Sequence, residues 1–251
     1  WYVNDNSLTG DVFTSALGNA GNSGTAACPF ATIAQAIAAC VAGDTIYADA
    51  GTYNENVAIN KALTLIGSGP ATTILTPTVA CTGDGISISV ANVNVSNLTV
   101  TGFNYGIRTS ASTISLYNVE SNSNCLYGLN TSTGTNGLTM VKCKFNTNTV
   151  GGWRAGTGDL VSNVLMDSSE VKGNGIGSNG FGMFIAASTP AANTFDYITI
   201  QNSDFSNNLE KGMYFEKLRH ALIDNVTINN SGTDVNYGFN TGIDINLKYD
   251  S

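Results

Sequence analysis

The sequence predicts an all-β fold, a parallel β-helix solenoid with a short N-terminal capping α-helix. The main observation is a phrase that recurs six times between residues 97 and 246: a glycine, an apolar residue, a variable residue and a small or apolar residue. A fixed period above about 20 residues, built from short strands, is typical of a solenoid. The six phrases begin at Gly106, Gly128, Gly152, Gly182, Gly212 and Gly242, which are 22, 24, 30, 30 and 30 residues apart.

A second phrase, predicted to be a short alternating strand, lies between the glycines and is followed by Asn-rich turns. Gly and Asn supply the positive φ angles that tight corners require, and stacked Asn side chains can bond along the solenoid axis. No apolar stripe of period 3.6 follows Val57, which argues against helical repeats. A sandwich or propeller is less favoured because hairpin signals are few. The second phrases are Asn97–Val100, Asn118–Ser121, Lys142–Phe145, Ser168–Val171, Asn202–Phe205 and Asn225–Ile228.

Composition restricts the function classes. The 251 residues carry a formal net charge of -8 and only 11% charged side chains. Without a basic stripe the chain is not expected to bind nucleic acid. No run of 18 apolar residues occurs, so no membrane span is expected. The unbroken repeat predicts one solenoid in two parts, a cap over residues 1–43 and β-helix coils over residues 44–251.

One helix is predicted, over residues 30–42. Ile33, Ile37 and Val41 lie on one face of this segment, and Gly43 is the expected stop. The first coil of a solenoid exposes apolar core and an unpaired strand edge. We therefore expect the helix to cover that end, with the first strands at residues 44–48, 51–53, 57–59 and 63–67.

The five cysteines match no zinc or CxxC spacing, so disulfides or buried thiols are expected. A bridge between Cys28 and Cys40, flanking the helix, is the favoured pairing. Burial of Cys as a small hydrophobe is the alternative. The remaining cysteines are Cys81, Cys125 and Cys143.

No cofactor is indicated by the sequence. The loop from Asn4 to Asp11 is rich in acids and amides, which are calcium ligands, but it lacks the EF-hand register. A solvated loop held by Asx turns is the favoured interpretation, and Ca²⁺ is the alternative left open.

The N-terminal sequence resembles that of a known family. Residues 29–37, 43–47, 51–53 and 63–67 are similar to the N-terminal cap and first coil of secreted right-handed parallel β-helix proteins of the pectin-lyase-like superfamily, which includes alginate lyases, chondroitinase B and many bacterial surface proteins. Residues 91–246 resemble the superfamily's generic coil. The resemblance implies a right-handed β-helix of bacterial type, secreted or on the cell surface, with a sugar-binding groove on the external face of one sheet.

Two signatures of that superfamily are missing. The strand matching the Asp-Pro-His-Glu signature of alginate epimerases contains Tyr214, Phe215, Glu216 and Lys217 instead. The tight acidic cluster that holds catalytic calcium in pectate-lyase relatives is not visible either. These departures leave the fold expectation intact but do not single out one enzymatic activity.

Strand alternation predicts one external column of side chains. If the apolar residue after each repeated glycine points inward, the next residue points outward, and stacking at about 4.8 Å per coil aligns those residues. Glu216 belongs to a parallel column two residues further along. The external column contains Arg108, Asn130, Arg154, Phe184, Tyr214 and Asp244.

An acidic polysaccharide is the expected partner of this face. Arginines would hold carboxylates, and the rings of Phe184 and Tyr214 would contact sugar rings. The alternative for these two rings is a secondary core under the connection 188–196. The substrate-binding candidates are Arg108, Asn130, Phe184, Lys211 and Lys217, and the catalytic candidates are Arg154, Tyr214, Glu216 and Asp244.

Two reactions fit these catalytic candidates. In β-elimination from a uronic acid, Arg154 would stabilise the developing charge, while Tyr214, Lys211 or Lys217 would exchange protons. In hydrolysis, Glu216 and Asp244 would be the paired carboxylates.

A second function class remains open from the sequence. The solenoid can be a non-catalytic adhesive or spacer module of a larger secreted protein, since no consensus catalytic cluster is present. No sequence that would form a cap follows the last coil. Further domains after Ser251, or a partner that covers this coil, are therefore expected.

Overall fold

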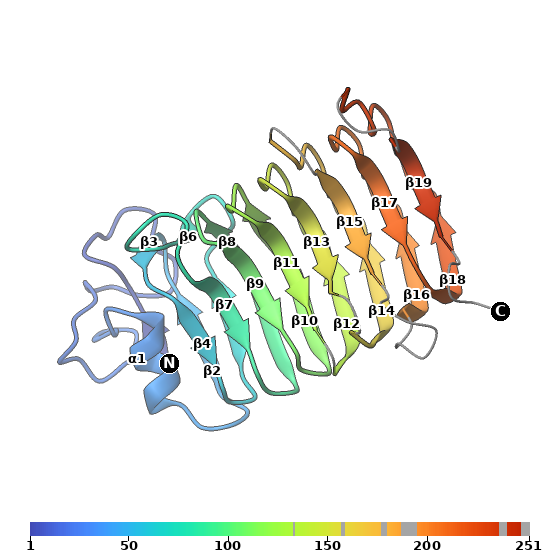
Figure 1. The fold of residues 1–251 in the computed structure, drawn as a ribbon. Helices are drawn as coiled ribbons and strands as arrows, with labels where there is room; N and C mark the ends of the chain where they lie inside the picture. The colour runs from blue at the N-terminus through green and yellow to red at the C-terminus, as the bar shows by residue number, and fades with distance from the viewer. Residues whose placement is uncertain (133, 157–158, 177–179, 187–194, 236–239, 247–251) are drawn as a thin grey trace.

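The computed structural model describes residues 1–251 except 133, 157–158, 177–179, 187–194, 236–239 and 247–251. In the described chain the predicted parallel β-helix is confirmed: strands stack side by side from the α1 end to β18 and β19 (Figure 1). The pairings between named strands are parallel in both sheets. Each strand therefore pairs with its equivalent one coil away, as the repeat requires.

Two sheets wrap the solenoid core. Sheet 1 contains β1 (Tyr2–Val3), β2 (Thr45–Ala48), β5 (Thr64–Gly67), β8 (Val93–Thr101), β10 (Ile114–Asn122), β12 (Thr135–Val141), β14 (Val161–Asp167), β16 (Phe195–Gln201) and β18 (Leu218–Asp224), with β3 (Gly51–Asn54) and β6 (Thr73–Thr76) beside this path. Sheet 2 contains β4 (Val57–Ile59), β7 (Asp84–Ile88), β9 (Tyr105–Thr109), β11 (Tyr127–Thr131), β13 (Gly151–Ala155), β15 (Phe181–Ile185), β17 (Lys211–Phe215) and β19 (Thr241–Ile245).

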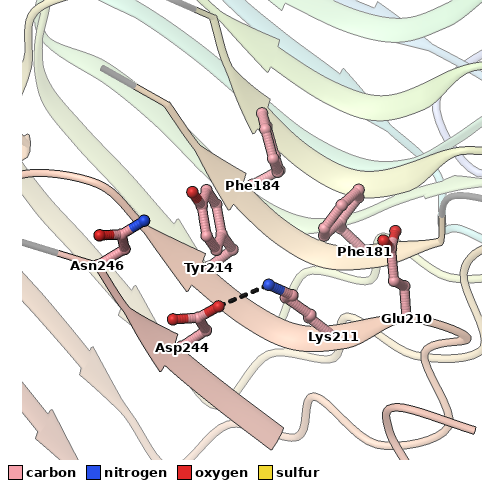
Figure 2. A pocket seen from close by; sticks show the side chains of 7 residues that line it. All are labelled: Phe181, Phe184, Glu210, Lys211, Tyr214, Asp244 and Asn246. Carbon is pink, nitrogen blue, oxygen red and sulfur yellow. Dashed lines mark hydrogen bonds and ion pairs between the residues drawn. The ribbon is translucent and has the colours of Figure 1, made fainter. Parts of the chain in front are cut away.

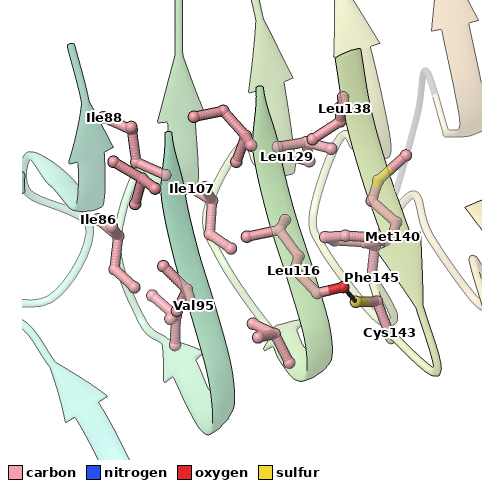
Figure 3. Packing of buried hydrophobic residues seen from close by; sticks show 14 of the residues in the cluster. Ile86, Ile88, Val95, Ile107, Leu116, Leu129, Leu138, Met140, Cys143 and Phe145 are labelled. Carbon is pink, nitrogen blue, oxygen red and sulfur yellow. Dashed lines mark hydrogen bonds between the residues drawn. The ribbon is translucent and has the colours of Figure 1, made fainter. Parts of the chain in front are cut away.

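The apolar residue after each of the first five repeated glycines is buried in the core, as predicted, whereas Ile243 in the last coil is 42% exposed. Ile107, Leu129 and Trp153 are at most 1% exposed. Ile107 and Leu129 face buried side chains of sheet 1 such as Leu116 and Leu138 (Figure 3). Burying one such side chain contributes about 1.5–3 kcal/mol, so this continuous row supplies much of the stability of the solenoid.

A ladder of buried asparagines runs along the corner before sheet 2. Asn124, Asn148, Asn174 and Asn208 are fully buried. Each of the first three donates its amide Nδ2 to Oδ1 of the next, at 3.1, 3.1 and 2.9 Å. Their backbone N–H groups donate to the same oxygens, at 2.9, 2.9 and 3.1 Å. The predicted axial bonding of Asn is thus present and satisfies backbone groups that the corner removes from the strand ladder.

The repeated glycines pack against this ladder. A Cβ on Gly106 would lie 2.6 Å from Nδ2 of Asn124 and 2.9 Å from the carbonyl oxygen of Gly128. A Cβ on Gly182 would lie 2.3 Å from the carbonyl oxygen of Gly212. The position admits no side chain, which explains why glycine recurs there.

The second phrase forms a corner and continues as a strand only in the earlier coils. Its first residue has a left-handed backbone in every coil, with φ between 49° and 56°. Asn97 and Asn118 lie within β8 and β10. In the later coils the pairing is reduced to single bridges at Lys144, Glu170, Asp204 and Thr227, so strands predicted there are wrong. In these later coils the long strands of sheet 1, β12, β14 and β16, end just before the second phrase begins.

Helix α1 (Ile33–Ala39) is shorter than the predicted 30–42. Thr32 is its N-cap, and a capping box with Gln35 fixes the first turn. The helix ends because Cys40 adopts an extended backbone. Val41 therefore lies outside the helix and is 66% exposed, contrary to the predicted apolar face, whereas Ile33 and Ile37 are buried.

The predicted Cys28–Cys40 disulfide is wrong. Cys28 is an exposed free thiol and Cys40 a buried one, whereas Cys81 and Cys125 are bonded with Cα atoms 5.5 Å apart. Their corner loops stack through the loop at Gly102: the Cys81 N–H donates to the carbonyl of Gly102. The bonded cysteines are 44 residues apart in the sequence, which is about two coils, because the register advances by 21 residues from Ile86 to Ile107 and by 22 from Ile107 to Leu129.

One buried carboxylate binds the segment that directly follows the acidic loop of residues 4–11. Asp49 is fully buried and accepts backbone N–H groups of Val12, Phe13 and Thr14 at 2.7–2.9 Å. Among the described residues no group of three or more His, Cys, Asp and Glu side chains is arranged to hold a metal ion. No helix within the described ranges is long and apolar enough to cross a membrane.

We expect Asn148→Ala to lower the free energy of unfolding by about 2–3 kcal/mol, because it leaves the buried N–H of Asn124 without an acceptor. Asn94→Ala is the matched control: that side chain is exposed and makes one 3.4 Å bond. Urea denaturation of both variants measures the difference. Equal midpoints would contradict a structural role for the ladder.

Removing the disulfide with Cys125→Ser should destabilise the protein by about 2–4 kcal/mol, since the bridge restrains a long loop in the unfolded chain. Cys28→Ser changes an exposed free thiol and should leave the thermal midpoint unchanged. Calorimetry with and without reductant distinguishes the two variants. Reductant should lower the thermal midpoint of wild type and Cys28→Ser, which retain the bridge, but not that of Cys125→Ser.

Candidate functional site

The predicted external column exists on the outer face of sheet 2. Arg108 pairs in register with Asn130, Asn130 with Arg154, and Arg154 with Phe184. The column continues to Tyr214 and Asp244 and begins one coil earlier at Ser87. The structure therefore aligns the six predicted column residues on neighbouring strands.

A second column, which alternation alone does not predict, runs beside the first. Each of its members directly precedes a repeated glycine. Strict alternation from Ile107 would place Tyr105 inward, but the buried Gly106 lets both Tyr105 and Arg108 lie outward. The signal that could have found this column is the position before each glycine. Its members are Asp84, Tyr105, Tyr127, Gly151, Phe181, Lys211 and Thr241, of which only Lys211 was a sequence candidate.

Arg108 lies over the ring of a tyrosine in this second column. Its Cζ is 5.2 Å from the centroid of Tyr105, and its Nη1 is 3.7 Å from Oδ2 of Asp84. The ring of Tyr105 stacks on that of Tyr127 at 6.1 Å. The side chain of Arg108 is nevertheless 51% exposed. The ring of Tyr105 therefore holds the guanidinium in place while its N–H donors remain accessible to a ligand.

Arg154, two coils further along the column, is also held over a tyrosine ring. Its Cζ lies 5.6 Å from the centroid of Tyr127, which belongs to the neighbouring strand β11. Gly151 makes this possible, because a Cβ there would approach the Tyr127 ring to 3.1 Å. Burial raises the pKa of Tyr127, while Arg154 lowers it. The ring thus remains a neutral platform under the guanidinium.

Asn130 lies between the two arginines. The residue is 5% exposed, and its Oδ1 has no hydrogen-bond partner among the described residues. A buried acceptor without a donor costs about 1–3 kcal/mol. A hydroxyl donor that reached this oxygen after a shift of the covering side chains would recover that energy.

An aromatic pocket lies further along the face (Figure 2). Phe184 and Tyr214 stack with ring centroids 5.1 Å apart, and Phe181 lies 4.6 Å from Phe184. Most of the connection 188–196, the alternative cover for these rings, lies outside the described residues. The pocket volume is about 280 Å³, and Glu210, Lys211, Asp244 and Asn246 complete its lining.

The floor of this pocket contains an ion pair. Lys211 Nζ lies 2.5 Å from Oδ2 of Asp244 and 4.6 Å from the ring centroid of Tyr214. The Lys211 side chain is only 7% exposed. A buried ammonium paired in this way is fixed in position, and the carboxylate of Asp244 offsets its charge within the pocket.

Tyr214 is held in its neutral form. Burial raises its pKa, and the 2.5 Å hydrogen bond that the phenol donates to Oε1 of Glu216 raises it further, to about 12. A bond from Asn246 acts in the opposite direction. At neutral pH the phenol can donate a proton, whereas removing a proton from a substrate would first require its ionisation.

The two candidate carboxylates already have intramolecular partners. Asp244 pairs with Lys211, and Glu216 accepts the phenol of Tyr214. Lys217 lies at the corner between β17 and β18, where its carbonyl accepts the N–H of Phe195 at 3.1 Å. The candidates other than Lys217 therefore lie along one face, but Arg108 on β9 is five strands from Asp244 on β19. The candidates that the structure gathers around the aromatic pocket are Phe184, Lys211, Tyr214, Glu216 and Asp244.

Comparisons with known proteins agree with the fold. The model of a family described as "Protein of unknown function (DUF1565)" matches residues 16–67, which include α1, β2 and β5. No curated protein matches the chain. The family match thus covers the N-terminal cap and the first coil.

Solved structures with similar folds include three proteins named for action on polysaccharides. Pectate lyase Pel9A shares 14% identity at a TM-score of 0.59, over 92% of this chain and 78% of its own. An alginate lyase from Paenibacillus sp. str. FPU-7 shares 15% identity at a TM-score of 0.58, over 84% of this chain and 76% of its own. A pectin methylesterase mutant in complex with a hexasaccharide shares 16% identity at a TM-score of 0.53, over 83% of this chain and 67% of its own. This chain has the fold of these proteins, the right-handed parallel β-helix.

Replacing Glu216 by Gln should lower the pKa of Tyr214 from about 12, because the ionised carboxylate stabilises the protonated phenol. Ultraviolet difference titration of the variant against wild type measures this shift. Tyr214→Phe, which lacks the phenol, identifies the signal. An unchanged titration curve would contradict the hydrogen bond between these two side chains.

Proposed function

We propose that the protein binds an acidic polysaccharide along the outer face of sheet 2. The observation that carries the proposal is the pair Arg108 and Arg154, each held over a tyrosine ring. Two coils separate them, a distance of about 10 Å. Ring-supported guanidiniums aligned along one axis match the repeating carboxylates of a uronic acid polymer.

The aromatic pocket supplies a second kind of contact. Phe181, Phe184 and Tyr214 present apolar ring surface beside Lys211 and Asp244. Planar side chains bind the apolar faces of sugar rings, and polar neighbours take up the hydroxyl groups. The fold neighbours named pectate lyase and alginate lyase support the same class of ligand.

Recognition without turnover is the form of this function that we favour. Each group able to exchange protons, including Tyr214, Glu216 and Asp244, already holds an intramolecular partner. If turnover occurs, Arg154 would stabilise the developing charge and Tyr214 would donate the proton. A non-catalytic surface module, the alternative drawn from the sequence, needs only the binding face.

Secretion or display at a cell surface belongs to the same proposal. The bond between Cys81 and Cys125 supports it, because disulfides persist in oxidising compartments. The ligand class supports it too, since polysaccharides of this kind are extracellular polymers.

We expect Arg154→Ala to reduce binding of polygalacturonate or alginate at least tenfold, since it removes a half-buried charge that would pair with carboxylates. The thermal stability should stay within about 0.5 kcal/mol of wild type. Isothermal titration calorimetry of the folded variants measures the loss. Ultraviolet absorbance of unsaturated uronate, followed in the same samples, reports lyase turnover.

The control is Lys142→Ala. Lys142 also lies over a tyrosine, 5.5 Å from the ring centroid of Tyr117, but Tyr117 belongs to β10 in sheet 1. Equal losses in both variants would show non-specific charge attraction and contradict the proposed face. Absence of binding by folded wild-type protein to every acidic polymer would overturn the proposal itself.

A further inference from the structure

A second hollow lies on the outer face of sheet 2, near its N-terminal end. Its volume is about 220 Å³. It opens around Arg108, on the opposite side of the arginine pair from the aromatic pocket. Its polar lining residues are one acid, one arginine and five residues with hydroxyl groups: Asp84, Arg108, Ser87, Ser89, Thr109, Ser110 and Ser132.

The chemistry of this serine hollow differs from that of the aromatic pocket. The serine hydroxyls of the lining that bond within the described chain do so only at long distances: Ser132 donates to the carbonyl of Thr109 at 3.3 Å and Ser89 to that of Ile59 at 3.4 Å. The hydroxyl of Thr109, in contrast, accepts the N–H of Ala111 at 3.0 Å. Arg108 keeps an exposed guanidinium and a weak 3.7 Å pair. One guanidinium surrounded by hydroxyls suits a carboxylate or sulfate and the sugar hydroxyls beside it.

The aromatic pocket lacks this hydroxyl lining and offers ring surface instead. Phe184 and Tyr214 form its stacked wall, and its cation Lys211 is already neutralised by Asp244. That hollow suits the face of a sugar ring rather than an anionic substituent.

The two hollows lie along one line. Strand β9, which carries Arg108, is separated from β15, which carries Phe184, by β11 and β13. At about 4.8 Å per coil the two side chains are about 14 Å apart along the axis. The column residues between them are Asn130 and Arg154, with an orphan acceptor on the first and a guanidinium on the second.

We propose that the two hollows are unlike subsites of one groove, and that its ligand is an extended anionic oligosaccharide that occupies both at once. The serine hollow takes an anionic unit, and the aromatic pocket takes the ring of a unit further along the same chain. This inference rests on the proposed function and adds the minimum length and the orientation of the ligand.

Simultaneous contact at two linked subsites raises affinity by more than either contact alone, on the order of 10² to 10⁴ in favourable geometry. Oligogalacturonates from the dimer to the decamer, titrated calorimetrically, should therefore show a steep rise in affinity of about a hundredfold at the length that reaches both hollows. Alginate oligomers of the same lengths provide a second uronate series.

Arg108→Ala should abolish the rise for long oligomers and leave the affinity of short oligomers in the aromatic pocket unchanged. Phe184→Ala should weaken short and long oligomers alike. Lys142→Ala is the control and should change neither. Both Arg108 and Lys142 are solvent-accessible, and circular dichroism confirms that the variants fold.

Three outcomes would count against the inference, and they differ in what else they overturn. Affinity independent of length in a wild-type protein that binds uronate polymers would overturn the two-subsite groove and leave the binding face intact. Equal loss for short and long oligomers in Arg108→Ala would do the same. Failure of wild type to bind any uronate oligomer or polymer would overturn both proposals.

Discussion

The fit of a glycine column against a ladder of buried asparagines is the constraint on which the rest of the structure depends. Asn148 both accepts from the coil before it and donates to the coil after it. The backbone at Gly106 and Gly128 can approach this ladder only without a side chain. Because each coil must satisfy the same contact, successive coils are forced into the same register even where their lengths differ.

That register creates the candidate site. The glycine places two consecutive residues of each strand inward, for example Gly106 and Ile107, so the flanking Tyr105 and Arg108 both face solvent. Repetition then turns a pair of outward positions into two adjacent columns. Around Arg108 and Arg154, the column before the glycines supplies the rings and the column after them supplies the cations, and their contact holds both arginines in place. The site follows from the same geometry that stabilises the solenoid.

The glycine period and the alternation were enough to predict the fold and the Arg108 to Asp244 column. They could not reveal that Tyr105 and Tyr127 face outward, because the buried glycine that follows each tyrosine interrupts the alternation. They also could not reveal that Cys81 lies beside Cys125, since pairing of distant loops depends on coil stacking. The end of α1 depended on the extended backbone of Cys40, which its sequence context does not indicate.

A crystal structure of the protein with a bound uronate hexamer or octamer tests the central claim most directly. The account predicts ordered sugar density along the outer face of sheet 2, with a carboxylate within hydrogen-bond distance of Arg154 and a sugar ring against Phe184 or Tyr214. Density over sheet 1 or at the Lys142 and Tyr117 pair, with an empty sheet 2 face, would contradict it.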